Sequence, residues 1–158
     1  MRIVTYQFSI RGKYLEIFIS GCKCVHECRK TCFNSELWNF DLGENYRGCY
    51  SEIYNKLTEF DELIDYIVIT GGEPLDQNID ELIDFIKYLK QFDKEIILFT
   101  SYSFDKVDTK VLELIDYVKT EPYLEEYKKK NKIFIFELAS INQKIFRKEG
   151  NLWKMMKT

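Results

Sequence analysis

The chain has 158 residues, of which 46% are hydrophobic and 16% aromatic, and this is enough for one folded domain with a substantial core. Its formal net charge is only −3, with lysine and glutamate residues scattered along the chain, which excludes the charge pattern of a general nucleic-acid or membrane-surface binder. We therefore expect a single domain over residues 1–158, with no nucleic-acid and no membrane partner.

Strands are expected where apolar runs are rich in β-branched and aromatic residues, at residues 3–10, 14–20, 66–70, 95–100, 115–118 and 133–136. Helices are expected at residues 50–60, from 76 or 78 to 89, and at 107–114. Ser51 is the expected N-cap of the first helix, and Asp76 or Asn78 that of the second. The three lysines at 128–130 are expected at a solvated helix end. This alternation predicts parallel βαβ units, in a chain too short for a complete eight-unit barrel.

Targeting signals are not visible in the sequence. The first residues are too few and too polar for a signal peptide, and no apolar run reaches the ~20 residues that cross a bilayer. We therefore expect a cytoplasmic protein, and in a reducing cytoplasm clustered cysteines bind metals rather than form disulfides. The odd number of cysteines, five, is a further argument against a framework made only of disulfides.

The densest group of reactive side chains follows the strand expected at 14–20. Four cysteines lie there within eleven positions, and they are Cys22, Cys24, Cys28 and Cys32. Thiolates this close repel one another unless a cation holds them, so the group predicts a metal site. Structural zinc is one alternative, although usual zinc patterns have two ligand pairs separated by a longer loop. The only histidine, His26, is expected to pack beside the site, and Cys49 lies apart as a plain thiol.

The strand expected at 66–70 runs directly into Gly71, Gly72, Glu73 and Pro74. Glycines at a strand end let the backbone approach a ligand without a Cβ in the way, and Glu73 offers an acceptor. A strand-to-helix turn selected only for its backbone conformation is the alternative. The next strand ends on 100–102, at the edge where parallel sheets place their ligands.

Several separated segments, taken together, resemble the radical S-adenosylmethionine (SAM) enzymes, and within them the small activating proteins of anaerobic ribonucleoside-triphosphate reductase. The segments are Ser20-Gly21-Cys22, Cys24-Val25-His26-Glu27-Cys28, Cys32-Phe33-Asn34, Leu37-Trp38-Asn39, Gly71 to Pro74, Phe99-Thr100-Ser101-Tyr102 and Ala139-Ser140-Ile141-Asn142-Gln143-Lys144. The resemblance implies an α/β fold, a partial and open parallel (β/α) barrel of the radical SAM type. It also implies a [4Fe-4S] cluster in the loop 21–34 and SAM at the segment 70–74.

The cluster implied by the resemblance is held by three cysteines, which leaves one iron without a protein ligand. Two ligand sets remain open. Cys24, Cys28 and Cys32 preserve the Cys-x-His-x-Cys pattern, whereas Cys22 in place of Cys24 preserves the Gly-Cys junction with the strand. The chain departs from the family in one respect, because three residues instead of two separate Cys28 from Cys32.

The cosubstrate residues implied by the resemblance come from three segments. Gly71, Gly72, Glu73 and Pro74 would meet the amino group of SAM; Thr100, Ser101 and Tyr102 would meet its adenosine portion; and Asn142 belongs to the late Asn-Gln element. Departures from the family are Ser101 in place of glycine, Leu138 and Ala139 in place of arginine and glycine, and Glu121-Pro122-Tyr123 in place of Gly-Pro-Phe.

The activity implied by the resemblance is reductive cleavage of SAM, followed by formation of a glycyl radical on anaerobic ribonucleotide reductase. No catalytic side chain is implied beyond the cluster and SAM, and a flavodoxin-type protein would donate the electron. Within the same chemistry, the substrate could be another glycyl-radical enzyme or a peptide. A non-catalytic zinc or iron–sulfur binding module is the alternative from a different class.

Overall fold

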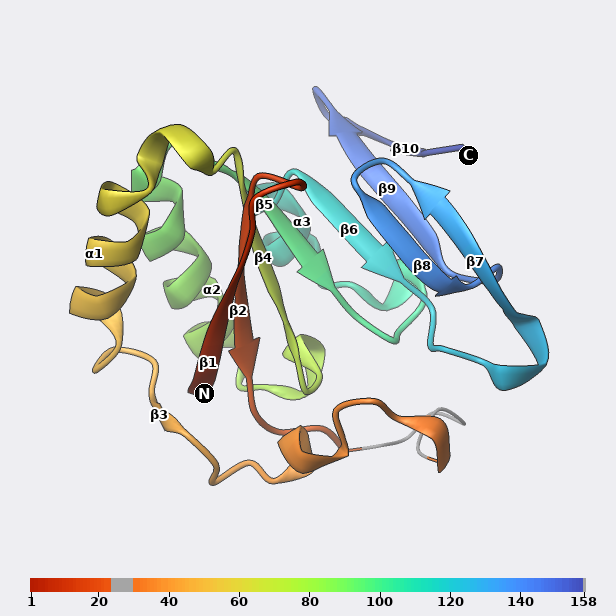
Figure 1. Ribbon diagram of the computed structural model, residues 1–158, viewed down its shortest axis with the longest axis horizontal. Coiled ribbons are helices and arrows are strands. Elements are labelled where there is room, and N and C mark those ends of the chain that lie inside the picture. The colour runs from red at the N-terminus through yellow and green to blue at the C-terminus, as the bar shows by residue number, and fades with distance from the viewer. Residues whose placement is uncertain (24–29, 158) are drawn as a thin grey trace.

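The computed structural model describes residues 1–23 and 30–157 of the chain (Figure 1). Its strands are β1 (Arg2–Ser9), β2 (Tyr14–Ile19), β3 (Glu44–Asn45), β4 (Tyr66–Gly71), β5 (Glu95–Phe99), β6 (Tyr117–Thr120), β7 (Lys128–Ile133), β8 (Phe136–Ser140), β9 (Lys144–Glu149) and β10 (Leu152–Met155). Its α-helices are α1 (Tyr50–Glu59), α2 (Ile79–Leu89) and α3 (Thr109–Leu114). Short 3-10 helices are η2 (Ser35–Trp38), η3 (Asp61–Leu63), η4 (Pro74–Asp76), η5 (Lys90–Phe92), η6 (Phe104–Lys106) and η7 (Glu125–Tyr127).

One mixed sheet of eight strands forms the centre of the described chain, in the order β10-β9-β6-β5-β4-β2-β1-β3. Its inner strands β2, β4, β5 and β6 are parallel, as the alternation of strands and helices predicts. The flanking strands β1 and β9 run antiparallel to their inner neighbours. Because the inner strands are parallel, the segments that follow β2, β4, β5 and β6 all lie along one edge of the sheet, which we call the carboxyl rim.

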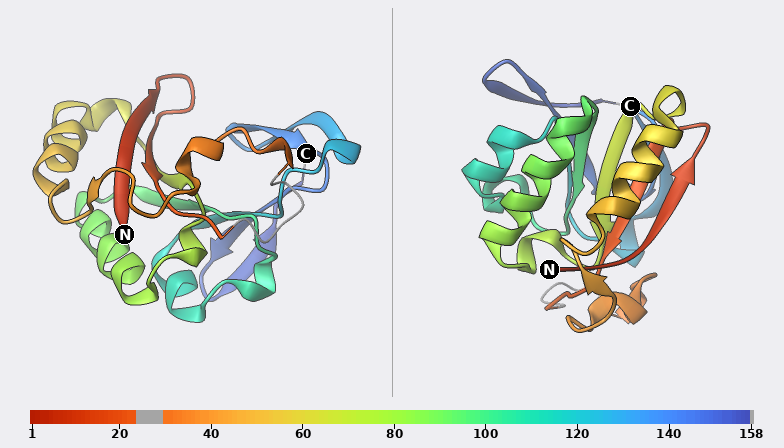
Figure 2. Two further views of the ribbon diagram at one scale, coloured as in Figure 1. Left: turned by 90° about the horizontal axis from the view of Figure 1, so that it is seen from below. Right: turned by 90° about the vertical axis from the view of Figure 1, so that its left-hand side faces the viewer.

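The three α-helices cover one face of the sheet, and the β7–β8 hairpin covers the other (Figure 2). Successive side chains of a strand point to opposite faces, so Ile67 and Ile69 of β4 pack under the helices while Val68 packs under the hairpin. This accounts for the nearly continuous apolar runs of the inner strands. Strands β4, β5 and β6 have buried residues on both faces, whereas β2 buries Leu15, Ile17 and Ile19 and leaves the alternate residues Tyr14, Glu16 and Phe18 half-buried.

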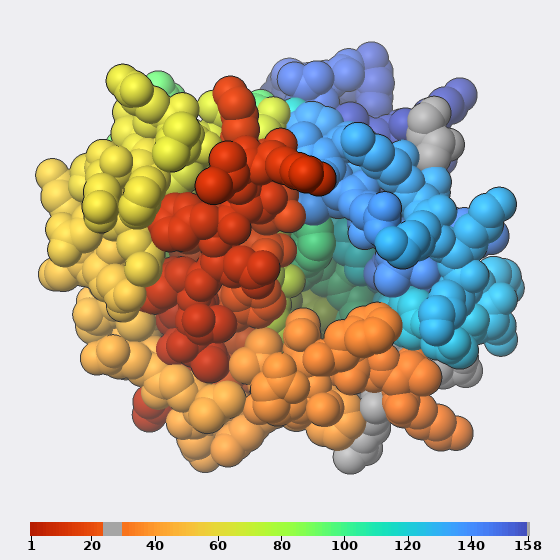
Figure 3. Space-filling view, in the orientation of Figure 1, coloured from red at the N-terminus to blue at the C-terminus, as the bar shows by residue number. Residues whose placement is uncertain are grey.

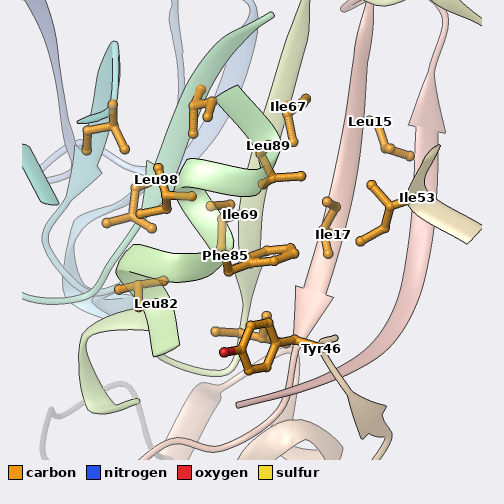
Figure 4. Packing of buried hydrophobic residues seen from close by; sticks show 14 of the residues in the cluster. Leu15, Ile17, Tyr46, Ile53, Ile67, Ile69, Leu82, Phe85, Leu89 and Leu98 are labelled. Atoms are coloured by element: carbon orange, nitrogen blue, oxygen red, sulfur yellow. The ribbon is translucent and has the colours of Figure 1, made fainter. Parts of the chain in front are cut away.

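Helix α2 supplies the largest part of the helical layer. Asn78 is its N-cap, with its side-chain oxygen accepting hydrogen bonds from the backbone N–H groups of Asp80 and Glu81, so the second of the two predicted caps is confirmed. Phe85 points from α2 toward the sheet beside Ile69 and Ile17 (Figure 4) and is fully buried. Burial of a phenylalanine side chain contributes about 1.5–3 kcal/mol, so this face fixes the helix on the sheet.

The strand predicted at 133–136 is wrong, because this run forms the turn between β7 and β8. Ile133 ends β7, Phe136 begins β8, and Phe134 between them has a positive φ of 58°. The run is apolar because the turn packs on the sheet, where the rings of Phe134 and Tyr117 stack with centroids 4.8 Å apart. The lysines at 128–130 are exposed, as predicted. Lys128 is the C-cap of the short 3-10 helix η7, and all three lysines form the start of strand β7.

The carboxyl-terminal hairpin of β9 and β10 extends the sheet beyond the predicted elements. The assignment of this sheet to a partial, open (β/α) barrel of the radical SAM type stays a prediction. In the described parts of the chain, no helix combines the length and the apolar character needed to cross a membrane.

Candidate functional site

A pocket of about 350 Å³ opens at the carboxyl rim. Figure 3 shows it as a hollow between the red amino-terminal strands, the orange segment after residue 30 and the light-blue β7–β8 hairpin. Each inner strand and the cysteine loop contribute to its lining, which includes Cys22, Cys32, Gly71, Gly72, Glu73, Thr100, Ser101 and Lys119. The cysteine loop and the glycine segment, 50 positions apart, therefore border one cavity.

The start of the cysteine loop lies against the end of β4, backbone to backbone. The N–H of Glu73 donates to the carbonyl of Gly21 at 2.9 Å, and the N–H of Gly72 donates to the carbonyl of Ile19 at 2.8 Å. A Cβ on Gly72 would lie 2.5 Å from the Gly21 carbonyl oxygen, and Gly71 has a φ of +110°. The glycines are thus required because the end of β4 packs closely against the start of the cysteine loop. The sequence analysis explained them by the approach of a ligand and did not predict this contact within the chain.

The side-chain amide of Gln77 stabilises the contact between the cysteine loop and the glycine segment. Its Nε2 donates to the carbonyls of Ser20 and Gly21 at 3.0 Å, and to that of Glu73 at 3.1 Å. These carbonyls belong to both sides of the junction, so one side chain satisfies backbone acceptors of the loop and of the glycine segment together. On the far side of the loop, the N–H groups of Gly21 and Cys22 donate to carbonyls of η2.

Glu73 is 2% exposed, and its carboxylate is held by donors of its own chain. Oε1 accepts from the Thr100 hydroxyl at 2.6 Å and from the N–H of Leu75 at 3.0 Å. Oε2 accepts from the hydroxyl of Ser101 at 2.5 Å and from its N–H at 2.8 Å. Each carboxylate oxygen thus accepts two hydrogen bonds, as a buried polar group requires. The carboxylate therefore joins the ends of β4 and β5 rather than presenting an open acceptor to the pocket.

A second buried carboxylate, that of Asp76, joins the rim to the cysteine loop. Its Oδ2 accepts from the backbone N–H of Lys23 at 2.6 Å, and its Oδ1 accepts from the hydroxyl of Tyr102 at 2.8 Å. Burial, and then the Asp76 carboxylate, raise the pKa of Tyr102, so this phenol stays protonated and donates.

Lys119 is the positively charged residue in the described part of the lining. It is 8% exposed, and its Nζ donates to the Glu121 carbonyl at 2.8 Å and lies 6.0 Å from the centre of the Phe99 ring. Glu16 of β2 lines the same pocket, and burial raises the pKa of its carboxyl group. Glu121 has a positive φ of 73° at the position where the resemblance expects glycine, and the chain turns there as glycine would allow.

The structure brings most of the predicted site residues to this pocket. Gly71, Gly72, Glu73, Thr100, Ser101, Cys22 and Cys32 line it. Three other predicted residues are not in its described lining, although each is close to it: Pro74 begins η4, Tyr102 contacts Asp76, and Asn142 donates through Nδ2 to the Pro122 carbonyl at 2.8 Å. Cys24, His26 and Cys28 lie outside the described residues.

Three functional candidates were missed by reasoning from the sequence: Asp76 as a contact of the loop, Gln77 and Lys119. The sequence holds a signal for one of them, because Lys119 is a charged residue inside a short strand that is otherwise apolar or small. The partners of Asp76 and Gln77 at the cysteine loop lie more than 50 positions away, and no local pattern indicates such contacts.

Replacement of Glu73 by glutamine tests the carboxylate network. The amide nitrogen would face either the N–H of Leu75 or that of Ser101, and a backbone N–H cannot turn to accept a hydrogen bond. We expect Glu73→Gln to lower the free energy of unfolding by about 1–3 kcal/mol, measured by urea denaturation of the apoprotein. The control is Glu62→Gln at an exposed position. Equal stability of the two variants would contradict the network.

The donor set at the pocket fits an iron–sulfur cluster. Cys22 and Cys32 bring thiol groups to it, and thiolates are the ligands that such clusters prefer. Among residues 1–23 and 30–157, no three potential metal-ligating side chains meet, and the remaining two cysteines of the loop lie outside these ranges.

Comparison with known proteins agrees with this chemistry. A family model described as a 4Fe-4S single cluster domain matches residues 11–146, which include the cysteine loop, the inner strands and the rim. The match favours an iron–sulfur cluster over the zinc alternative. No curated protein sequence matches the chain. Because the family model spans most of the sequence, the chain belongs to the 4Fe-4S single cluster domain family.

Proposed function

We propose that the protein is a radical SAM activating enzyme, which cleaves SAM reductively at a [4Fe-4S] cluster and generates a glycyl radical on anaerobic ribonucleotide reductase. One observation carries this proposal: thiols of the cysteine loop and the Gly71–Gly72 backbone line the same pocket. A cluster held at the loop and a small polar cosubstrate at the glycine segment would then be in contact.

The chain's own groups would bind and orient the cosubstrate. The Glu73 carboxylate is occupied by donors from Leu75, Thr100 and Ser101, so it would position the rim, and backbone carbonyls would meet the amino group of SAM. Thr100 and Ser101 would border the adenosine portion. Tyr102 and Asn142 would stabilise the rim through their hydrogen bonds to Asp76 and to the Pro122 carbonyl. When bound, the cluster would supply the one electron that cleaves the sulfonium into methionine and a 5′-deoxyadenosyl radical.

A protein substrate suits the size of the site. Ligand pockets usually measure about 300–1,000 Å³, and a volume of about 350 Å³ leaves little room for a second small molecule beside SAM. A glycine-bearing loop of a large partner would approach over the open rim. The 5′-deoxyadenosyl radical would take the hydrogen atom from the glycine Cα, giving 5′-deoxyadenosine and the glycyl radical. A flavodoxin-type protein is the proposed electron donor.

A second candidate substrate is another glycyl-radical enzyme or a peptide. The observation that favours it is the presence of Leu138 and Ala139 in the pocket lining, where the resemblance expects arginine and glycine. With Leu138 and Ala139 there, the pocket would present apolar side chains to a partner in place of the positive charge of an arginine.

The proposed ligands of the cluster are Cys24, Cys28 and Cys32, with Cys22 as the alternative first ligand. The iron content of reconstituted variants separates the two sets. We expect Cys24→Ala to lose the cluster and Cys22→Ala to keep about four irons per chain, because three thiolates suffice to hold a cubane. The reverse result would assign Cys22 as the ligand, and a cluster retained in both variants would contradict both sets.

Formation of 5′-deoxyadenosine tests the proposed activity. The reconstituted protein, reduced with dithionite and incubated with SAM under anaerobic conditions, should produce 5′-deoxyadenosine and methionine in equal amounts, measured by chromatography and mass spectrometry. Cys32→Ala should lower the yield at least a hundredfold, because it removes a thiolate common to both ligand sets. The control, Cys49→Ala, changes a buried thiol at the start of α1 and should retain activity.

The absence of 5′-deoxyadenosine from a protein that holds a full cluster would overturn the proposed activity. It would leave a non-catalytic iron–sulfur binding module. If the activity is found, addition of anaerobic ribonucleotide reductase tests the partner, since the glycyl radical gives its own electron paramagnetic resonance (EPR) signal on that protein.

A further inference from the structure

Asp76 has no role in capping the helix that follows it. Asn78 caps α2, and the side chain of Asp76 turns instead toward the cysteine loop. This side chain is only 2% exposed, although an isolated carboxylate is costly to remove from water. A buried carboxylate that does not cap the following helix and contacts the cysteine loop instead indicates a role in that loop.

The partners of Asp76 define that task. Oδ2 accepts from the backbone N–H of Lys23, the residue between the two candidate ligands Cys22 and Cys24. Oδ1 accepts from the hydroxyl of Tyr102, whose backbone N–H donates to the hydroxyl of Thr100, just after β5. The Lys23 ammonium lies 3.8 Å from Oδ1, but its side chain is 60% exposed, so water screens that pair. The backbone contact is the strong one, because charge-assisted hydrogen bonds of this length are about twice as strong as neutral ones.

We infer that Asp76 is a positioning residue of the cysteine loop, and that its buried charge lowers the reduction potential of the cluster bound there. The hydrogen bond from Lys23 fixes the backbone between Cys22 and Cys24 against the rim. The negative charge disfavours the added electron of the reduced cluster, since net charge and solvent exposure around a cluster set its potential. Tyr102 holds the carboxylate in place and donates to it without neutralising it.

This inference rests on the cluster of the proposed function and not on cleavage of SAM. A lower potential makes the reduced cluster a stronger reductant, which is what cleavage of a sulfonium requires. Asp76 would therefore combine two tasks in one side chain: it places the first part of the loop, and it strengthens the reducing power at the pocket.

Three variants separate charge from position. Asp76→Asn keeps the size and one acceptor oxygen but removes the charge, Asp76→Ala removes both, and Tyr102→Phe leaves the charge and removes its second donor. Asp80→Asn is the matched control, because Asp80 is an exposed acid at the start of the same helix. The full chain is reconstituted anaerobically and titrated with dithionite, while EPR follows the reduced cluster.

We expect Asp76→Asn to hold as much iron as the wild type and to favour reduction at least tenfold, a rise in midpoint potential of about 59 mV for one electron. Asp80→Asn should keep the wild-type potential, and Tyr102→Phe should shift it less than Asp76→Asn does. An unchanged potential in Asp76→Asn with a full cluster would overturn the electrostatic part of the inference alone. A wild-type chain that takes up no cluster would overturn that part together with the proposed function.

Hydrogen exchange of the apoprotein tests the positioning part without any cluster. In the wild type, the Lys23 N–H should exchange slowly, because Asp76 holds it. Asp76→Ala should raise its exchange rate at least tenfold, while Asp80→Asn should not. Equal exchange rates in the wild type and Asp76→Ala would overturn the positioning role.

Discussion

The contact on which the site depends is the close approach of two backbone segments just beyond the ends of β2 and β4. The parallel pairing of these strands continues past their last residues, through the hydrogen bonds from Gly72 to Ile19 and from Glu73 to Gly21. Only glycine fits at Gly72, because a Cβ would lie 2.5 Å from a carbonyl oxygen. Through this contact, the loop that carries the cysteines and the segment proposed to meet the cosubstrate become one rigid junction at the rim of the sheet.

Two buried polar side chains, those of Glu73 and Asp76, and the half-buried side chain of Gln77 then fix the junction in place. Glu73 joins β4 to β5, Gln77 joins η4 to the start of the loop, and Asp76 joins the loop to Tyr102. Buried polar groups of this kind are favourable only when they are satisfied, and these make hydrogen bonds with partners from distant segments. The rim is thus ordered by the chain's own polar contacts, which is the preorganisation that a site for a reactive cosubstrate needs.

Local patterns in the sequence predict the inner sheet and the helical layer well. Apolar runs predict β2, β4 and β5, and Asn78 with the stripe from Leu82 to Leu89 predicts α2, because burial and capping leave a periodic signal. The run at 133–136 shows the limit of such patterns, because an apolar turn packed on a sheet has the composition of a strand. The roles of Asp76 and Gln77 were beyond prediction for a different reason, since their partners are brought near only by the fold. The motif at 71–74 predicted the location of the site. Only the structure shows that the Glu73 carboxylate accepts hydrogen bonds from Thr100 and Ser101 of the same chain.

The most direct measurement is the EPR spectrum of the anaerobically reconstituted, reduced protein, recorded with and without SAM. Binding of SAM at the open iron, beside the Gly71–Gly72 wall, predicts a reduced-cubane signal whose shape changes when SAM is added. A full cluster signal that is identical at saturating SAM would contradict the shared pocket of cluster and cosubstrate. A chain that holds zinc and gives no cluster signal would contradict the radical chemistry altogether.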